Sequence, residues 1–135
     1  MSKNVVKLIS KAIKERKLIA LRYRGQADIR VIEPHAMYRD DRGEVVVDGF
    51  QVRGFSASGR PPPFWRPYRI KKITALNVLG DHFIPRLSEG FTLSKQRYKK
   101  ELLAAVDVDG MHYMYPPEAL HDMGPPKPEF TRRYF

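Results

Sequence analysis

The chain has 135 residues, of which 30% are charged and 42% hydrophobic, a composition typical of one globular domain rather than a disordered chain. It contains no cysteine, which excludes disulfides and thiolate metal sites. We find no signal-peptide pattern and no run of about 18 apolar residues that could span a membrane. We therefore expect a soluble, cytoplasmic protein.

The net charge is +10, and the positive charge is concentrated in two stretches. Residues 1–30 and residues 61–100 each hold nine basic against two acidic residues, whereas the rest of the chain is slightly acidic. Clustered cations attract anions, which favours nucleic acid, nucleotides or other phosphorylated ligands as partners. A surface that is merely solvated is the alternative.

The first 17 residues predict one amphipathic helix that starts at Ser2, a suitable N-cap, and ends near Arg16 or Lys17. Lysines occupy one face, and the other carries apolar residues at helical spacing: Val5, Leu8, Ile9, Ala12 and Ile13. A single helix cannot form a helix-turn-helix, which needs two.

From Ile19 the hydrophobic period changes to two, which predicts β-strands. Gly49 marks a bulge or a close backbone approach, and Pro34 bends its strand. We expect strands over residues 19–24, 29–38, 44–52, 68–79 and 82–84, with a hairpin loop at 40–43 and a longer loop at 54–63. The short connections imply an antiparallel meander.

From Ser94 the pattern becomes helical again, with one face formed by Tyr98, Leu102, Leu103 and Val106. After Gly110 the chain holds five of its eleven prolines together with several aromatic residues, which indicates an irregular tail, either disordered or wrapped on a partner. The predicted fold is mainly β: a small SH3/Sm-like antiparallel barrel with an N-terminal helix, a C-terminal helix and a tail. Residues 1–91 would form the barrel unit and residues 92–135 the remainder.

Several spaced motifs between residues 8 and 91 resemble a WYL domain. They are Tyr23-Arg24-Gly25, the segment from Arg30 to His35, the segment from Gly49 to Ser56, the segment from Phe64 to Ile73, Phe83-Ile84-Pro85-Arg86, and Gly90-Phe91. The tripeptide that names the family is replaced here by Val45-Val46-Val47. The resemblance implies a short, stand-alone member without the winged helix-turn-helix and the C-terminal extension domain. It also implies an SH3/Sm-like barrel that binds a nucleotide-like or nucleic-acid ligand.

No pattern in the sequence indicates catalysis. The four histidines lie far apart without metal-ligand spacing, Ser56 and Ser58 follow no nucleophile-elbow pattern, and no phosphate-binding loop occurs. We expect no enzyme activity, no cofactor and no metal.

The segment around Arg66 is the best candidate site, because guanidinium groups bind phosphate and aromatic rings stack on bases. Strand alternation places Arg66, Tyr68 and Ile70 on one face, so Arg66 points toward the interior or mouth of the barrel. A buried arginine needs an anion, either a ligand or an internal partner such as Glu33 or Asp48. His35 is either a ligand contact or a structural histidine, and Trp65 either a stacking residue or a hydrophobic plug. The candidate ligand-binding residues are Arg30, His35, Gln51, Arg53, Trp65, Arg66 and Arg69.

Two functions follow from these features. The first is a non-catalytic regulatory module that binds nucleic acid, single-stranded rather than duplex, or a nucleotide. The second is a protein-interaction subunit that docks on a larger assembly through its barrel and tail. A homodimer is compatible with both.

Overall fold

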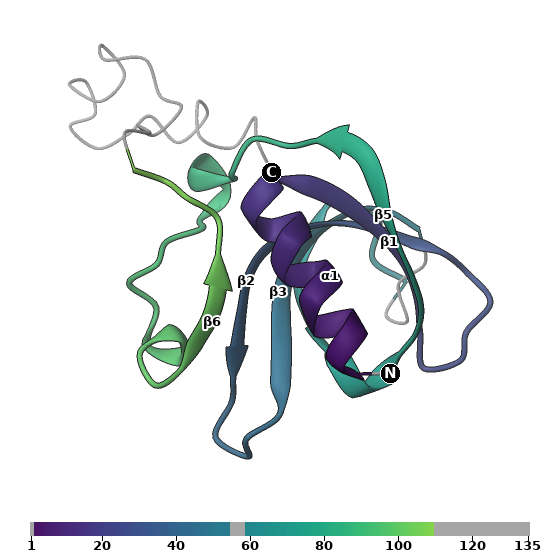
Figure 1. The fold of residues 1–135 in the computed structure, drawn as a ribbon. Helices are drawn as coiled ribbons and strands as arrows, with labels where there is room; N and C mark the ends of the chain where they lie inside the picture. The colour runs from purple at the N-terminus through teal and green to yellow at the C-terminus, as the bar shows by residue number, and fades with distance from the viewer. Residues whose placement is uncertain (1, 55–58, 110–135) are drawn as a thin grey trace, which may run out of the picture. The chain divides into compact units, whose positions relative to one another are not determined.

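The computed structural model describes residues 2–54 and 59–109. The predicted N-terminal helix is confirmed as α1 (Ser2–Glu15). Of its predicted apolar face, Leu8 is 43% exposed and the other members are buried, and Lys7, Lys11 and Lys14 are exposed. Ile9, Ala12 and Ile13 are fully buried, because α1 packs against four of the strands (Figure 1).

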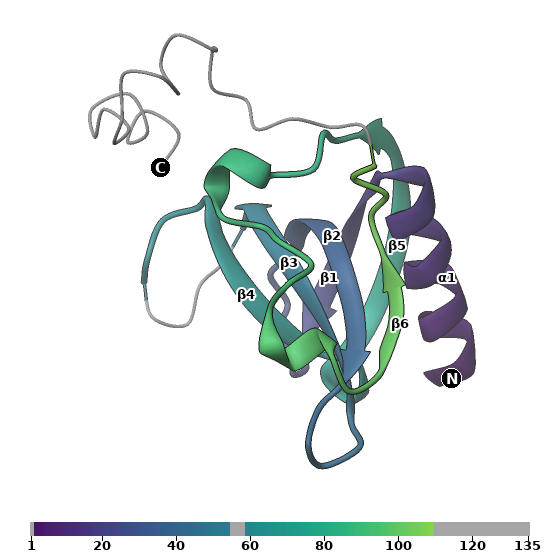
Figure 2. The same cartoon turned by 90° about the vertical axis from the view of Figure 1, so that its left-hand side faces the viewer.

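In the described part of the chain, six strands form one antiparallel sheet. The strands are β1 (Lys17–Tyr23), β2 (Arg30–Arg39), β3 (Val45–Arg53), β4 (Phe64–Arg69), β5 (Ile73–His82) and β6 (Leu102–Ala105). The order of hydrogen-bonded neighbours is β4-β3-β2-β1-β5, with β6 paired to β2. Figure 2 shows the sheet from the side, with α1 on one side of it. The mainly β, antiparallel character predicted from the sequence is confirmed.

The predicted barrel is wrong, because the described strands do not close on themselves. β4 and β5 are the two ends of the hydrogen-bonded path, and no ladder joins them within residues 2–54 and 59–109. The 3₁₀ turn η1 (Ile70–Lys72) lies between them and redirects the chain, so that β5 returns to pair with β1. The same turn splits the single long strand expected over residues 68–79, and the strand expected at 82–84 is only the end of β5 at His82.

The predicted C-terminal helix is also wrong. Residues Gln96–Tyr98 form a 3₁₀ turn (η3), and the segment that follows becomes β6. β1 pairs with only the first part of β2, which leaves backbone groups of Ala36, Met37 and Tyr38 open. β6 satisfies them, and this tertiary pairing outweighs the local helical pattern. Burial consequently alternates with a period of two, with Ala104 and Val106 inside.

Gly49 and Pro34 lie opposite each other in the β2–β3 ladder, next to a register shift. A Cβ atom at Gly49 would collide with Cγ2 of Ile32, whose side chain is fully buried. The close approach at Gly49 is therefore made by a side chain rather than by another backbone, and the register shift lies at Pro34, where the sequence predicted a bend.

The chain divides into two compact units, Met1–Ile84 with Leu93–Asp107 and Pro85–Thr92 with Val108–Phe135. In the second, η2 (Leu87–Glu89) ends at Gly90 in the left-handed conformation, and Arg86 pairs with Glu89 at 3.3 Å. The irregular tail predicted after Gly110 lies outside the described residues. No helix in the described ranges has the length and apolar character needed to cross a membrane.

Candidate functional site

The β3–β4 pair carries two faces of different character, because residues paired across a ladder share a face. The face that we call the Tyr68 face contains Val47, Gly49, Gln51, Phe64, Arg66 and Tyr68. The opposite face, which we call the Asp48 face, contains Val46, Asp48, Phe50, Trp65, Pro67 and Arg69. The shared face predicted for Arg66 and Tyr68 is confirmed, whereas Ile70, predicted on the same face, lies beyond the end of β4 in η1.

On the Tyr68 face, two arginines converge on two tyrosine rings. The guanidinium carbon of Arg30 lies 5.3 Å from the centroid of the Tyr23 ring, and that of Arg66 lies 5.8 Å from the same ring. Arg66 is also 5.8 Å from the Tyr68 ring, which meets the Tyr23 ring edge-on at 5.4 Å. All three distances from guanidinium carbon to ring centroid are within the range of cation–π attraction. We call this group, together with Gln51, the arginine–tyrosine cluster.

Burial governs the chemistry of the cluster. Tyr68 is fully buried, and its hydroxyl donates a hydrogen bond to Oε1 of Gln51. Burial raises the pKa of Tyr68 to about 12, while the nearby charges of Arg30 and Arg66 act in the opposite direction. Tyr68 is therefore a neutral hydrogen-bonding group at physiological pH. The Arg30 side chain is only 1% exposed and donates from Nη2 to Gln26 Oε1 at 2.9 Å.

Arg66 is incompletely satisfied within the cluster. It forms no ion pair with any residue in the described part of the chain, and its Nε atom is buried without a hydrogen-bond partner. The internal pairing with Glu33 or Asp48 that the sequence left open is not formed among these residues. Since a desolvated cation is unfavourable without a partner, an anion bound to Arg66 would lower the free energy of this site.

The Asp48 face holds two of the predicted residues in an aromatic group. The His35 ring lies 4.8 Å from Trp65 and 4.9 Å from Phe83, and Trp65 lies 5.0 Å from Phe50. His35 is fully buried and donates from Nδ1 to the carbonyl oxygen of Glu33 at 2.9 Å. This is the geometry of a packed structural histidine, on the face opposite the arginine–tyrosine cluster.

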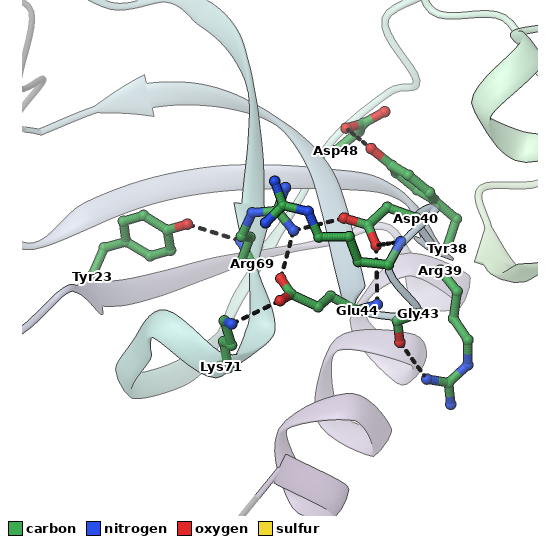
Figure 3. Close-up of polar contacts among 10 residues, drawn as sticks. Tyr23, Tyr38, Arg39, Asp40, Gly43, Glu44, Asp48, Arg69 and Lys71 are labelled. Atoms are coloured by element: carbon green, nitrogen blue, oxygen red, sulfur yellow. Dashed lines mark hydrogen bonds and ion pairs between the residues drawn. The ribbon is translucent and has the colours of Figure 1, made fainter.

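Arg69 is held by two carboxylates (Figure 3). Its Nη1 atom lies 2.7 Å from Asp40 and 2.6 Å from Glu44, and Glu44 also accepts from Lys71 at 2.7 Å. The hydrogen bond from Arg69 lowers the pKa of Asp40, and Lys71 followed by Arg69 lowers that of Glu44. The Arg69 side chain is thus engaged in linking the end of β4 to the β2–β3 hairpin.

The Asp48 carboxylate is the shared hydrogen-bond acceptor of three side chains. It is 4% exposed and accepts hydrogen bonds from Arg97 Nε at 2.8 Å, from the Tyr98 hydroxyl at 2.6 Å and from the Tyr38 hydroxyl at 3.3 Å. Burial, then the Asp48 charge, raises the pKa of Tyr38 to about 12. Arg97, rather than Arg66, is therefore the cation that offsets this buried carboxylate.

The seven predicted residues separate into three groups. Arg30, Gln51 and Arg66 come together in the arginine–tyrosine cluster, whereas His35 and Trp65 pack on the Asp48 face. Arg69 is occupied by ion pairs, and Arg53 is exposed at the end of β3, beside a register shift.

Sequence reasoning missed two contributors. Tyr23 is the last of the alternating buried residues of β1, after Ile19 and Leu21, and this position in the alternation indicates that its ring faces the interior. Arg97 lies in a basic run at residues 95–100. Because this run was predicted to be part of a helix, the contact between Arg97 and Asp48 was not expected.

The cluster offers guanidinium, amide and hydroxyl groups, which suit an anion with polar substituents. Within the described ranges no group of three or more His, Asp or Glu side chains could hold a metal ion.

Neither a family model nor a curated protein matches the chain. Among solved structures, the chain is similar to the proteasome accessory factor B/C (PafBC) of Arthrobacter aurescens, with 19% sequence identity and a TM-score of 0.49. The similarity covers 64% of this chain and 13% of that chain. The resemblance to WYL domains stays a prediction from the sequence.

Proposed function

We propose that the chain is a non-catalytic, regulatory binding module for an anionic, nucleotide-like ligand, with Arg66 and Arg30 as the phosphate-binding side chains. The observation that carries the proposal is the state of Arg66: ring-stacked on Tyr23 and Tyr68, without an ion pair in the described ranges, and with a buried, unsatisfied Nε. A phosphate would supply the missing acceptor, and guanidinium groups bind phosphate through two parallel hydrogen bonds.

The direct test is nucleotide binding to the intact chain, with AMP, ADP and ATP as probes. Trp65 is the single tryptophan and the neighbour of Arg66 in sequence, so its fluorescence provides a built-in readout beside calorimetry. We expect Arg66→Met to weaken binding about tenfold to hundredfold, as expected for loss of a charge-assisted hydrogen bond. Arg66→Lys should recover only part of it, because lysine lacks the planar fork.

Arg69→Met is the matched control, since it removes the same charge from the same strand but from the opposite face. Equal losses in the two variants, or no nucleotide binding by the wild type, would contradict the proposed site. Phosphate release from the bound nucleotide, at a rate above that of a protein-free sample, would contradict the non-catalytic assignment.

One observation favours the second function, a protein-interaction subunit. Among the described strands β5 pairs with β1 alone, and its residues from Ile73 to Gly80 carry no charge although Val78 is 37% exposed. Uncharged edge strands are templates for pairing with another chain. If this edge docks a protein, Val78→Lys abolishes capture of that protein while Arg66→Met leaves it intact. Deletion of residues 110–135 tests whether the C-terminal tail also contributes.

A further inference from the structure

A groove of about 760 Å³ lies between two segments of the larger compact unit. It shares Tyr38 and Arg97 with a smaller pocket of about 230 Å³ that Arg66 also lines. One wall is the end of β2 and the start of the following hairpin, from Tyr38 to Asp41. The other wall is the basic run, contributed by Lys95, Gln96, Arg97, Lys99 and Lys100. The sequence marked the stretch that contains this run as strongly basic, but the proposed function makes no use of it.

Positive charge dominates the groove. Five of the lining side chains are cationic and two are acidic. Of the two acids, Asp40 already pairs with Arg69, which lies outside the groove lining, and Asp41 is almost fully exposed, 3.5 Å from Lys100. Exposed pairs of this kind contribute little and exchange readily with water or with another anion.

Two lysines of the groove are available to an external anion. Lys95 and Lys99 form no ion pair with any residue of the described ranges, in contrast to Arg97, which holds Asp48, and Arg39, which pairs with Glu101 at 3.2 Å. The ammonium groups of Lys95 and Lys99 therefore retain their full attraction for a ligand.

The wall that carries these lysines is fixed in place. Arg97 and Tyr98 both hydrogen-bond to the buried carboxylate of Asp48, at 2.8 and 2.6 Å. The backbone N–H of Arg39 donates to the carbonyl of Glu101 at 3.1 Å, and β6 follows directly. Because the cations project from an anchored segment, little backbone order is lost when a ligand binds.

The lining also indicates what the groove recognises. Among the described residues that line it, the one aromatic residue is Tyr38, which is 5% exposed, so these residues offer no platform for base stacking and no apolar pocket for an anchor residue of a protein. Its volume exceeds what a single phosphate fills. We infer that the groove binds the phosphodiester backbone of single-stranded nucleic acid, without base preference, as a second site that is independent of the nucleotide site proposed above.

The test uses the full chain and a fluorescein-labelled oligothymidylate of about 16 nucleotides, the upper end of known single-strand site sizes. Binding is followed by anisotropy over a range of salt concentrations. For the double variant Lys95→Gln/Lys99→Gln we expect the slope of log K against log salt to fall by about 1.4, since each phosphate contact on a single strand contributes about 0.7. The corresponding loss of affinity is about 25-fold at about 0.1 M salt.

Two control variants distinguish binding at the groove from a general effect of net charge. Lys7→Gln/Lys14→Gln removes the same charge from exposed positions on α1, and it should leave both the slope and the affinity nearly unchanged. Lys95→Arg/Lys99→Arg keeps the charges and should bind as the wild type does. Equal losses in the α1 and groove variants would overturn the inference, because net charge alone would then explain binding.

Two further outcomes are decisive. Polyglutamate of similar length that competes as well as the oligonucleotide would assign the groove to acidic protein segments instead. In the Arg66→Met background, Lys95→Gln/Lys99→Gln should lower the slope by the same amount as in the wild type. If Arg66→Met alone abolishes oligonucleotide binding while the groove variant does not, the oligonucleotide binds at the nucleotide site and the inference for the groove is wrong.

Discussion

On the Asp48 face of β4, Arg69 lies between two carboxylates, whereas three residues earlier, on the Tyr68 face, Arg66 lies over two tyrosine rings. The charges on the Asp48 face are balanced from within, since Asp48 has Arg97 and Arg69 has Asp40 and Glu44. Arg69 thus links structural elements on one face, whereas on the other face Arg66 has no ion pair with a described residue. The two residues are of the same type, so what distinguishes them is the face of β4 on which each lies.

The largest loss of stability should come from replacing Asp48, the buried carboxylate of the Asp48 face. Asp48→Ala leaves the hydroxyls of Tyr38 and Tyr98 without their acceptor and releases Arg97. We expect the free energy of unfolding, measured in urea, to fall by about 3 kcal/mol. Asp48→Asn keeps an acceptor and should lose less. A loss below about 1 kcal/mol in the alanine variant would contradict a central role for Asp48.

A smaller change in stability should distinguish the two arginines, because replacing Arg66 should stabilise the protein and replacing Arg69 should destabilise it. Arg66→Met replaces a partly desolvated cation with an apolar side chain of similar length, so we expect unfolding to become less favourable by up to about 1 kcal/mol. Arg69→Met breaks two ion pairs and should lower the melting temperature. If both variants are destabilised alike, then Arg66 is structural and the contrast between the faces fails.

The smallest effect is a dependence of the melting temperature on pH that comes from the ion pairs of Arg69 with Asp40 and Glu44. The folded protein lowers the pKa of Asp40 and of Glu44 below their ordinary values of 3.8 and 4.5. The resulting stabilisation is present above those values and is lost as the pH falls through the folded-state pKa of each group. The melting temperatures of the wild type and Arg69→Met should therefore differ most near neutral pH and converge in acid.

Arg66→Met is the control for this pH series. No carboxylate of the described ranges pairs with Arg66, so the difference between this variant and the wild type should stay constant over the same acid range. A difference that shrinks in acid would reveal a carboxylate partner for Arg66.

Local patterns predicted α1, the hairpin at residues 40–43 and the shared face of Arg66 and Tyr68, because each depends on the spacing of neighbouring residues. The pairing of β6 with β2 could not be predicted, because the segment from Tyr98 to Val106 satisfies a helical pattern and only the open edge of β2 selects a strand. The open sheet was missed because closure depends on where η1 redirects the chain.

The candidate site was predictable to a similar extent. Alternation placed Arg66 toward the interior, but the choice of Arg97 as partner of Asp48 depends on a contact between residues far apart in the chain. Whether Arg30, Gln51 and Arg66 bind a ligand stays a prediction.

The pairing of β6 with β2 also has a consequence for the order of folding. Ala36 and Tyr38 meet Ala105 and Leu102 only after most of the chain has been synthesised, so this loop closes late and at an entropic cost. Until it closes, the second half of β2 presents a bare hydrogen-bonding edge that β6 of another molecule could occupy. Refolding at high protein concentration should therefore yield strand-exchanged dimers, and dilution should favour the monomer.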